Sequence, residues 1–459
     1  MRSILKLILK FLARRIISRY HPIVIGVTGS VGKTTAKEAI YRVLKKRFYV
    51  RKNEDNFNNE FGVPYAVLGI NAKHIFSFNS AVKRKRLIAW GIVKAFWLGF
   101  GWPRQDYPKV LDLELAASRP GDIQHLVSIV RPTIGVLTAI GQVPVHLEFY
   151  KSPKHLAQEK AKLIQSLLPD PSTTLEIEKE RRMLPRRSLA VLNYDDQAVV
   201  EMKNLSRAKT VTFSFSPQAD LWASEISYFT GVEGKVGGLA FKINQGASFV
   251  PMRLNNIIAK HQIYGVLAAT VVALHLGMNL VDVSMALEDF VPPKGRMNLL
   301  RGIKNSIIID DTYNASPAST EAALESLTEF GGRVITSQGR GRKLAVLGDM
   351  LELGESSVAA HEKIGVLVPK HADLIFFVGD KMKLAAATAR EAMPHDSIFE
   401  FPDSVMAAIA VQAAIREGDV ILVKGSQGIR LEKVVAEIMA EPERKSELLA
   451  RQYGEWLNC

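Results

Sequence analysis

The chain has 459 residues, of which 47% are hydrophobic and 23% are charged, and its formal net charge is +14. This length predicts two or three domains, and the composition excludes both a disordered chain and a protein with several membrane spans. The only cysteine, Cys459, excludes a disulfide framework and a cysteine-based metal site. Such cysteine usage fits a cytoplasmic protein.

The excess positive charge lies in two segments. Residues 1–20 and residues 73–105 contain many lysines and arginines and no acidic residue, and the rest of the chain is close to neutral. A diffuse nucleic-acid-binding surface is therefore not expected. Both segments are also apolar, and the second carries Trp90, Trp97 and Trp102. Neither is long and uninterrupted enough to span a bilayer, so we expect either peripheral contact with an anionic membrane or helices docked on the protein's own core.

A glycine-rich loop at residues 26–35, with the sequence GVTGSVGKTT, lies between a predicted strand at 23–25 and a predicted helix at 36–45. This arrangement directs backbone N–H groups and the helix dipole at one point, which predicts binding of a nucleotide phosphate. Lys33 is expected to reach the outer phosphate oxygens and Thr34 to hold Mg²⁺. Val27 stands where the usual pattern has its first glycine, so Thr28 and Gly29 are expected to form the turn.

Apolar strands alternate with helices along the first part of the chain, which predicts a parallel sheet with ligands at the carboxyl ends of its strands. Strands are predicted at 23–25, 48–50, 110–115, 134–138 and 188–192, and a helix at 156–168. Residues 169–187 are predicted to form an exposed loop, 210–243 antiparallel strands and 257–276 a long helix.

The pattern breaks at residues 292–296, and a second α/β series follows. Its strands are predicted at 306–311, 344–348, 374–379 and 420–424. The expected fold is therefore α/β, with a P-loop ATPase domain and a Rossmann-like domain. We predict a basic amphipathic extension at 1–21, a central ATP-binding domain at 22–298 that carries the basic insert 73–105, and a C-terminal domain at 299–459.

Nine segments in order carry a resemblance to a known family. They are TGSVGKTT (28–35), NFNNEFGVP (56–64), ELAASRPGDI (114–123), VHLE (145–148), EKAK (159–162), KGRM (294–297), DDTYNASP (310–317), LGDMLELG (347–354) and KGS (424–426). They resemble the Mur ligases, the ATP-dependent amide-forming enzymes of peptidoglycan precursor synthesis. The resemblance covers about residues 22–440, and it is greatest to the branch that adds D-alanyl-D-alanine to a UDP-N-acetylmuramoyl-tripeptide.

The resemblance implies a reaction in which ATP activates a carboxylate as an acyl phosphate, which an amine then attacks. It implies catalytic roles for Lys33, His146, Lys160 and Arg296. The ATP-binding residues that it implies are Gly29, Ser30, Gly32, Lys33, Thr34, Thr35, Asn58, Arg296, Asp311, Tyr313 and Asn314. It further implies that Mg²⁺ is held by Thr34, Glu114, His146 and Lys160, the last of these as a carbamate.

The chain departs from the family pattern in two places. Gln262 and Gly265 stand where the family has an asparagine pair on the adenine side. Only about 21 residues precede the loop, too few for the family's domain that binds the uridine nucleotide. We therefore expect the acceptor's carrier to be bound differently, and a lipid-linked acceptor is one alternative.

Two more functions are compatible with the sequence: ligation to a folate-like acceptor, and a membrane-associated nucleotide-binding scaffold without catalysis. The expected partners are small molecules, namely the muramoyl-tripeptide and D-alanyl-D-alanine, with no nucleic acid. The expected state is a monomer in the cytoplasm, with peripheral contact at the inner face of the membrane.

Overall fold

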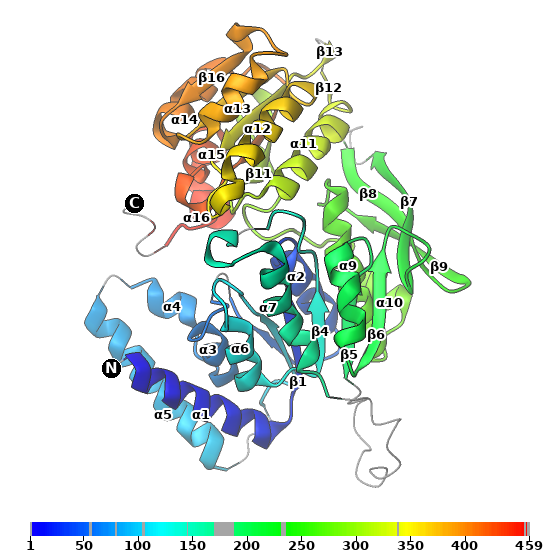
Figure 1. Ribbon diagram of the computed structural model, residues 1–459, viewed down its shortest axis with the longest axis vertical. Coiled ribbons are helices and arrows are strands. Elements are labelled where there is room, and N and C mark those ends of the chain that lie inside the picture. The colour runs from blue at the N-terminus through cyan, green and yellow to red at the C-terminus, as the bar shows by residue number, and fades with distance from the viewer. Residues whose placement is uncertain are drawn as a thin grey trace.

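The computed structural model describes residues 2–54, 57–78, 80–102, 106–144, 146–168, 188–230, 236–336, 339–453 and 456. Two α/β layers, each built around its own sheet, are stacked along the long axis of the molecule (Figure 1). This arrangement confirms the predicted α/β class with parallel sheets. The predicted loop at 169–187 and residues Asn56 and Val145 of the family-like segments lie outside the described residues.

The first sheet has the strand order β2-β3-β1-β4-β5-β6-β7-β8-β9. Its strands are β1 (Ile23–Thr28), β2 (Val50–Lys52), β3 (Val110–Glu114), β4 (Ile134–Leu137), β5 (Leu189–Asn193), β6 (Lys209–Ser214), β7 (Leu221–Thr230), β8 (Val236–Gln245) and β9 (Ser248–Leu254). The strands from β2 to β7 pair in parallel, whereas β7, β8 and β9 are antiparallel. The antiparallel pairing predicted for 210–243 is therefore correct for β7 and β8, but it is wrong for β6, which continues the parallel part of the sheet.

The second sheet has the order β10-β11-β17-β14-β15-β16. Its strands are β10 (Asn298–Arg301), β11 (Ile307–Asp311), β14 (Lys343–Gly348), β15 (Leu374–Val378), β16 (Ile398–Phe401) and β17 (Val420–Lys424), and a separate small pair joins β12 (Ile335–Thr336) to β13 (Gly339–Arg340). Only β10 runs antiparallel to its neighbour. The four predicted strands are confirmed, but the short edge strands β10 and β16 were missed because neither is a continuous apolar run.

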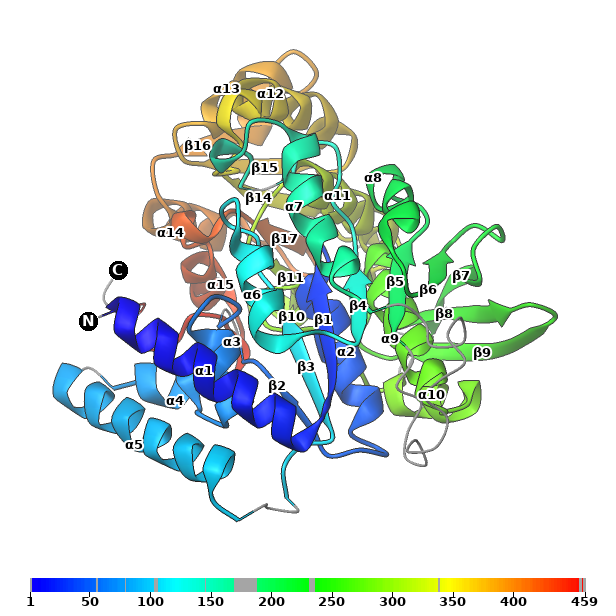
Figure 2. The ribbon, with the colours of Figure 1, turned by 60° about the horizontal axis from the view of Figure 1, so that its bottom comes forward.

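Helices cover both sheets (Figure 2). Around the first sheet are α1 (Arg2–Tyr20), α2 (Lys33–Leu44), α3 (Gly62–Leu68), α4 (Ala72–Phe76), α5 (Ala81–Phe100), α6 (Asp122–Val130), α7 (Pro153–Gln165), α8 (Gln197–Val200), α9 (Ile263–His275) and α10 (Leu280–Leu287). Around the second are α11 (Pro317–Gly331), α12 (Ser357–Leu367), α13 (Met382–Ala389), α14 (Ser404–Ala414), α15 (Glu432–Ile438) and α16 (Lys445–Leu448). Among the helices of the described residues, none is long and apolar enough to cross a membrane.

The helix predicted at 257–276 is shorter than expected at its start. α9 begins at Ile263, and a short 3₁₀ turn at Lys260–Gln262 precedes it. Residues 257–259, just before this turn, are not helical. Ala259 is extended, and the carbonyl of Ile258 accepts a hydrogen bond from the Tyr228 hydroxyl. The apolar pattern continues through this segment because Ile257, Ile258 and Ala259 are buried in the core without being helical.

The core on either face of the first sheet explains where the phosphate-binding loop sits. β1 lies inside its parallel part, between β3 and β4, and all of its residues are buried. α2 and α9 pack together on one face, and α6 and α7 pack on the other. The inner side of α1 joins that second core through Leu9, Leu12 and Ile16, each stabilising the fold by roughly 1.5–3 kcal/mol. The N-terminal segment is thus docked on the core by one side.

Asp112 on β3 has a buried carboxyl group with an unusual environment. Neither of its carboxylate oxygens accepts a hydrogen bond from any described residue. Burial raises the pKa of this carboxyl well above its ordinary range, although Lys37 opposes the shift. The folded protein therefore binds a proton at Asp112 more tightly than the unfolded chain does, so the contribution of this residue to stability falls as pH rises above about 4.

We expect Asp112→Asn to raise the free energy of unfolding by about 1–3 kcal/mol at neutral pH, because it removes the cost of burying an anion. The gain should shrink near pH 4, where Asp112 is protonated in the folded protein. Urea denaturation at both pH values measures it. A variant that loses stability, or whose gain is independent of pH, would contradict the expectation.

Candidate active site

The loop between β1 and α2 has the shape of a phosphate cradle. Gly29 and Gly32 both have positive φ, 149° and 83°, and a Cβ on Gly29 would collide with the hydroxyl of Thr138 on the neighbouring strand end. Gly32 caps α2, whose first backbone N–H groups therefore point toward the loop. Val27 is fully buried within β1, which continues to Thr28. The turn thus begins at Gly29, which explains why no glycine is needed at position 27.

Lys33 occupies the position that faces the loop interior. Its Nζ donates a 3.1 Å hydrogen bond to the carbonyl of Ser30. Burial lowers the pKa of Lys33 to about 8, with Arg296 acting in the same direction and Glu114 opposing both. Because burial disfavours the charged form of Lys33, an anion in the loop would stabilise its ammonium group.

Glu114, at the carboxyl end of β3, is held next to the start of α2. Its two carboxylate oxygens accept hydrogen bonds from Thr34 Oγ1 at 3.0 Å and from Asn58 Nδ2 at 2.9 Å. Burial would raise the pKa of Glu114, but the nearby cations Lys37 and Lys33 outweigh it, so the pKa is lowered and the group is ionised. A carboxylate and a hydroxyl are hard oxygen donors of the kind that Mg²⁺ takes beside phosphate oxygens.

Asn53 fixes the backbone of Glu114 in this position. Its side chain accepts a hydrogen bond from the backbone N–H of Glu114 and donates one to the carbonyl of the same residue, both at 2.9 Å. The prediction did not include Asn53. The only signal in the sequence was an asparagine directly after a strand, and that signal is too common to single out a residue.

Lys160 on α7 points at the same loop. Its Nζ donates a 2.9 Å hydrogen bond to the carbonyl of Gly29, and the residue is only 2% exposed. Burial lowers the pKa of Lys160 well below its ordinary value, and Lys33 adds to the shift. Burial therefore favours the neutral amine of Lys160 over its ammonium form, and the neutral amine is the form that reacts with electrophiles such as CO₂.

Arg296 reaches the loop from the segment that joins the two sheets. Its Nη2 donates a 3.4 Å hydrogen bond to Thr34 Oγ1, and its guanidinium lies 4.1 Å from the centre of the Tyr313 ring. Arg451 lies 5.1 Å from the centre of the same ring. Tyr313 is thereby fixed by two cations. Arg451 was missed, since no local pattern relates residue 451 to residue 313.

Asp311 and Lys424 form a buried ion pair where the second sheet meets the loop. Lys424 Nζ lies 2.6 Å from Asp311 Oδ2, and the two residues are paired in the parallel register of β11 and β17. Lys424 also donates a 2.9 Å hydrogen bond to the carbonyl of Asn314. Lys424 was not among the predicted site residues, although its place at the end of an apolar strand was a usable signal.

His146 is placed differently from the other predicted residues. Its Nδ1 lies 2.5 Å from a carboxylate oxygen of Glu352, in the second layer, and both residues have positive φ. The hydrogen bond from His146 lowers the pKa of Glu352. Thr34 and Lys160 instead bond to Glu114 and to the carbonyl of Gly29, so the structure joins His146 to the opposite layer rather than to the other predicted metal ligands.

A pocket between the two layers is lined by part of the loop and by Arg296, Asp311 and Lys424, whereas Lys33, Glu114, Lys160 and His146 are not among its lining residues. Its lining includes Ser30, Gly32, Thr35, Gln262, Arg296, Asp311, Asn314 and Lys424. Three buried polar atoms in it, Ser30 Oγ, Gln262 Oε1 and Arg296 Nε, have no hydrogen-bond partner among the described residues. Unpaired buried donors and acceptors of this kind cost free energy unless a polar ligand satisfies them. The pocket is therefore built for a polar ligand that carries negative charge.

Gly265 lines the same pocket, at a position where there is little room for a side chain. A Cβ at this position would lie 3.0 Å from a methyl of Thr35 and 3.1 Å from the backbone nitrogen of Ala36, because α9 crosses the first turn of α2 there. The asparagine of the family pattern therefore does not fit without displacing α2, whereas Gln262 donates to the carbonyl of Arg296 at 2.9 Å.

We expect Gly265→Asn to weaken ATP binding rather than to improve it, because it displaces the first turn of α2. The expected cost is about 1–3 kcal/mol in the free energy of unfolding and a severalfold rise in the dissociation constant for ATP. Gly265→Ala should give a smaller effect in the same direction. Urea denaturation and calorimetric titration measure the two effects, and tighter ATP binding by Gly265→Asn would contradict this explanation.

Comparison with known proteins gives matches along most of the chain. The "Mur ligase middle domain" model matches residues 104–273, and the "Mur ligase, glutamate ligase domain" model matches residues 295–427. The UDP-N-acetylmuramoyl-tripeptide–D-alanyl-D-alanine ligase of Bacillus subtilis is 28% identical over 425 residues, which is 91% of this chain and 76% of that relative. The enzyme of the same name from Mycobacterium tuberculosis is 29% identical over 435 residues, covering 91% of this chain and 73% of its own.

A solved structure, the MurF ligase of Thermotoga maritima in complex with ADP, is similar across both layers. It is 26% identical, with a TM-score of 0.71, over 96% of this chain and 83% of that one. The second family model begins at residue 295, next to Arg296, which lines the pocket between the layers. On these matches and on this fold, the chain belongs to the Mur ligase family.

Proposed function

We propose that this protein is an ATP-dependent ligase that joins D-alanyl-D-alanine to a UDP-N-acetylmuramoyl-tripeptide by a peptide bond. One observation carries the proposal. Lys33, Thr34, Glu114, Lys160 and Arg296 converge on a single phosphate-binding loop from separate parts of the chain. The names of the similar proteins support the choice of substrates.

The residues suit a reaction whose charge is carried by phosphoryl oxygens. Lys33 and the N–H groups at the start of α2 would bind the phosphates of ATP, and Arg296 would balance the charge that develops during phosphoryl transfer. Catalysis of this type depends on positioning, which the hydrogen bonds of Thr34 and Asn58 to Glu114 provide. An amine that attacks the resulting acyl phosphate then displaces phosphate.

Thr34 and Glu114 would hold one Mg²⁺, whose chemistry is to neutralise the phosphate oxygens. Among the described residues there is no group of three His, Cys, Asp or Glu side chains that could hold a metal ion alone. This fits an ion completed by phosphate oxygens and water rather than by a protein cage. A second metal role for His146 stays a proposal, which requires that His146 exchange its contact with Glu352.

The decisive experiment measures phosphate release and product mass with the full chain, ATP and Mg²⁺. We expect release only when both UDP-N-acetylmuramoyl-tripeptide and D-alanyl-D-alanine are present, with a product heavier than the tripeptide by one dipeptide less water. Binding of ATP without release under any pairing would support a scaffold without catalysis. Release with glutamate and a folate would instead identify a folate-like acceptor.

The carrier of the acceptor is a separate proposal. A parallel assay compares a lipid-linked tripeptide with the nucleotide-linked tripeptide as acceptors, and equal or better use of the nucleotide form would count against a lipid-linked acceptor. The expectations of a monomer and of a cytoplasmic location also stay predictions, which size-exclusion chromatography and cell fractionation test.

A further inference from the structure

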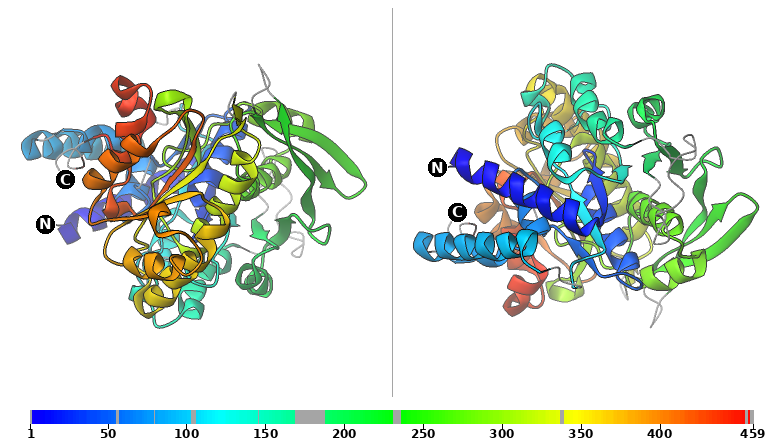
Figure 3. Two further views of the ribbon diagram at one scale, coloured as in Figure 1. Left: turned by 90° about the horizontal axis from the view of Figure 1, so that it is seen from above. Right: turned by 90° about the horizontal axis from the view of Figure 1, so that it is seen from below.

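α1 and α5 lie side by side at one edge of the molecule and run in the same direction (Figure 3). Their carboxyl ends are joined, because Arg19 donates hydrogen bonds to the carbonyls of Gly99 and Gly101 and the Tyr20 hydroxyl donates to that of Leu98. The inner side of α5 packs on the protein, with Ala95 buried and Gly91 against Ile70. The two helices are thus fixed as a pair.

The outer side of this pair is apolar and exposed. We call it the α1–α5 face and define it as Ile4, Leu7, Ile8, Phe11, Trp90, Val93, Phe96, Trp97, Phe100 and Trp102. Leu7 is 68% exposed, Trp97 66% and Trp102 92%. The face is continuous between the helices, because the rings of Phe11 and Phe100 stack with centroids 6.1 Å apart. Exposed aromatic residues in such number mark an interaction surface.

The charged residues of the two helices themselves have one sign, although Glu60 pairs with Lys6 of α1. Neither helix contains an acidic residue, and Lys83, Lys85, Arg86 and Lys94 on α5 are at least partly exposed. A protein partner would need a complementary acidic surface over its whole extent, whereas an anionic bilayer offers apolar depth and negative headgroups together. Tryptophan and lysine are the residues that favour this boundary.

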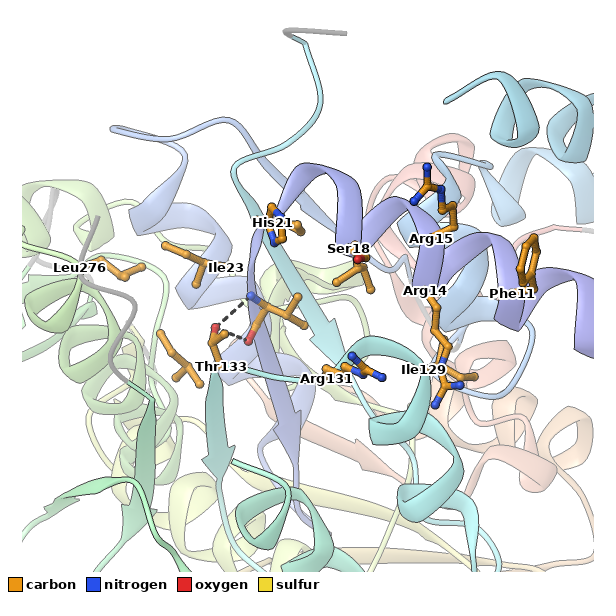
Figure 4. A pocket seen from close by; sticks show the side chains of 14 residues that line it. Phe11, Arg14, Arg15, Ser18, His21, Ile23, Ile129, Arg131, Thr133 and Leu276 are labelled. Atoms are coloured by element: carbon orange, nitrogen blue, oxygen red, sulfur yellow. Dashed lines mark hydrogen bonds between the residues drawn. The ribbon is translucent and has the colours of Figure 1, made fainter. Parts of the chain in front are cut away.

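A basic pocket of about 480 Å³ continues the pattern at the inner end of α1 (Figure 4). Arg14 and Arg131 lie toward it on one side of α1, while Arg15 lies on the other side over the Phe100 ring. None of the described residues that line it is acidic. Its floor includes Ile23 and Thr133, at the start of β1 and beside β4, which is the end of the sheet opposite to the phosphate-binding loop.

We propose that the α1–α5 face docks this protein on the surface of an anionic lipid bilayer. The aromatic side chains enter the headgroup boundary, and the basic residues of α5 and α1 lie at the phosphate level. Because the loop lies at the other end of the parallel strands, the docked protein keeps its nucleotide pocket open to the solvent. The proposal stands apart from the ligase activity.

The test is flotation of the full chain with vesicles of phosphatidylcholine, alone or in an equimolar mixture with phosphatidylglycerol. We expect binding to the mixed vesicles only, with weaker binding at high salt. Replacing Lys83, Lys85 and Arg86 by glutamine should lower the partition coefficient by about a hundredfold. Replacing Trp90, Phe96 and Trp97 by serine should lower it at least about tenfold.

Matched controls replace exposed apolar residues elsewhere, Phe249→Ser and Met285→Ser, and these should bind vesicles like the unmodified chain. Circular dichroism verifies that each variant is folded. Wild-type binding that is equal on both vesicle types, or absent, overturns the proposal. So does a dimer in size-exclusion chromatography that the aromatic variant converts to a monomer while vesicle binding is absent, because the face would then be an interface between two copies.

Discussion

Lys160→Ala is expected to lower kcat of the proposed ligase by about a thousandfold, while the protein stays folded and binds ATP. The physical reason is that Lys160 is buried with its Nζ on the carbonyl of Gly29, so that its side chain lies at the phosphate-binding loop, and that burial lowers its pKa and favours the amine form. Steady-state phosphate release measures the loss. Lys154→Ala, at an exposed lysine of the same helix, is the matched control and should keep full activity.

The carbamate at Lys160 has a separate signature. The neutral amine nitrogen attacks CO₂ and releases one proton to solvent, which converts the side chain into an anion suited to a cation site. We therefore expect activity to fall in CO₂-depleted buffer and to return with bicarbonate, together with a carbamate carbon signal in ¹³C NMR. If activity is independent of CO₂ while Lys160→Ala is inactive, Lys160 acts as the amine or ammonium and the carbamate proposal is wrong.

Lys33→Met should lower kcat/KM for ATP by about a thousandfold or more, since it removes the cation at the centre of the loop. The pKa of about 8 for Lys33 gives a further expectation. Above pH 8 the free enzyme carries a neutral Lys33, so kcat/KM for ATP of the unmodified protein should fall as pH rises through about 8. Bound phosphate favours the charged form, so kcat at saturating ATP should be less sensitive.

Lys46→Met, at an exposed lysine just beyond the end of α2, is the control for the substitution of Lys33. It should leave both the rate and the pH profile unchanged. The residual activity of Lys33→Met should lack the alkaline decline. A decline of the same size in that variant would mean that another group titrates, and the assignment to Lys33 would be wrong.

The sequence was a good guide where function depends on local patterns. The loop and the ends of β3 and β11 could be predicted, because apolar runs define strands and parallel strands place their carboxyl ends at one edge. The end of β1 was placed too early, at residue 25 instead of Thr28. Glu114 and Thr34 are therefore adjacent, as the resemblance implied. The start of α9 was not predictable from periodicity, because buried extended residues and buried helical residues show the same apolar pattern.

Several contacts in the site are encoded by no local pattern. The contact of Arg451 with the Tyr313 ring joins residues that are far apart in the sequence. The pair of His146 and Glu352 joins two residues with positive φ from different layers. The partner of Asp311 is Lys424, which the strand order β11-β17 brings beside it although three other strands of this sheet lie between them in the chain. Non-sequential strand order of this kind is set by the packing of the whole layer.

The chain passes between the two layers once, and Arg296 lies on that crossing segment. A rotation of the layers about this segment would leave Arg296 close to Thr34 and would carry Asp311 and Asn314 toward the loop or away from it. The phosphate chain and the adenosine of a nucleotide would then respond differently to this rotation. Affinity for inorganic tripolyphosphate would be nearly constant during such a rotation, whereas the additional affinity contributed by adenosine would measure how far the layers have closed.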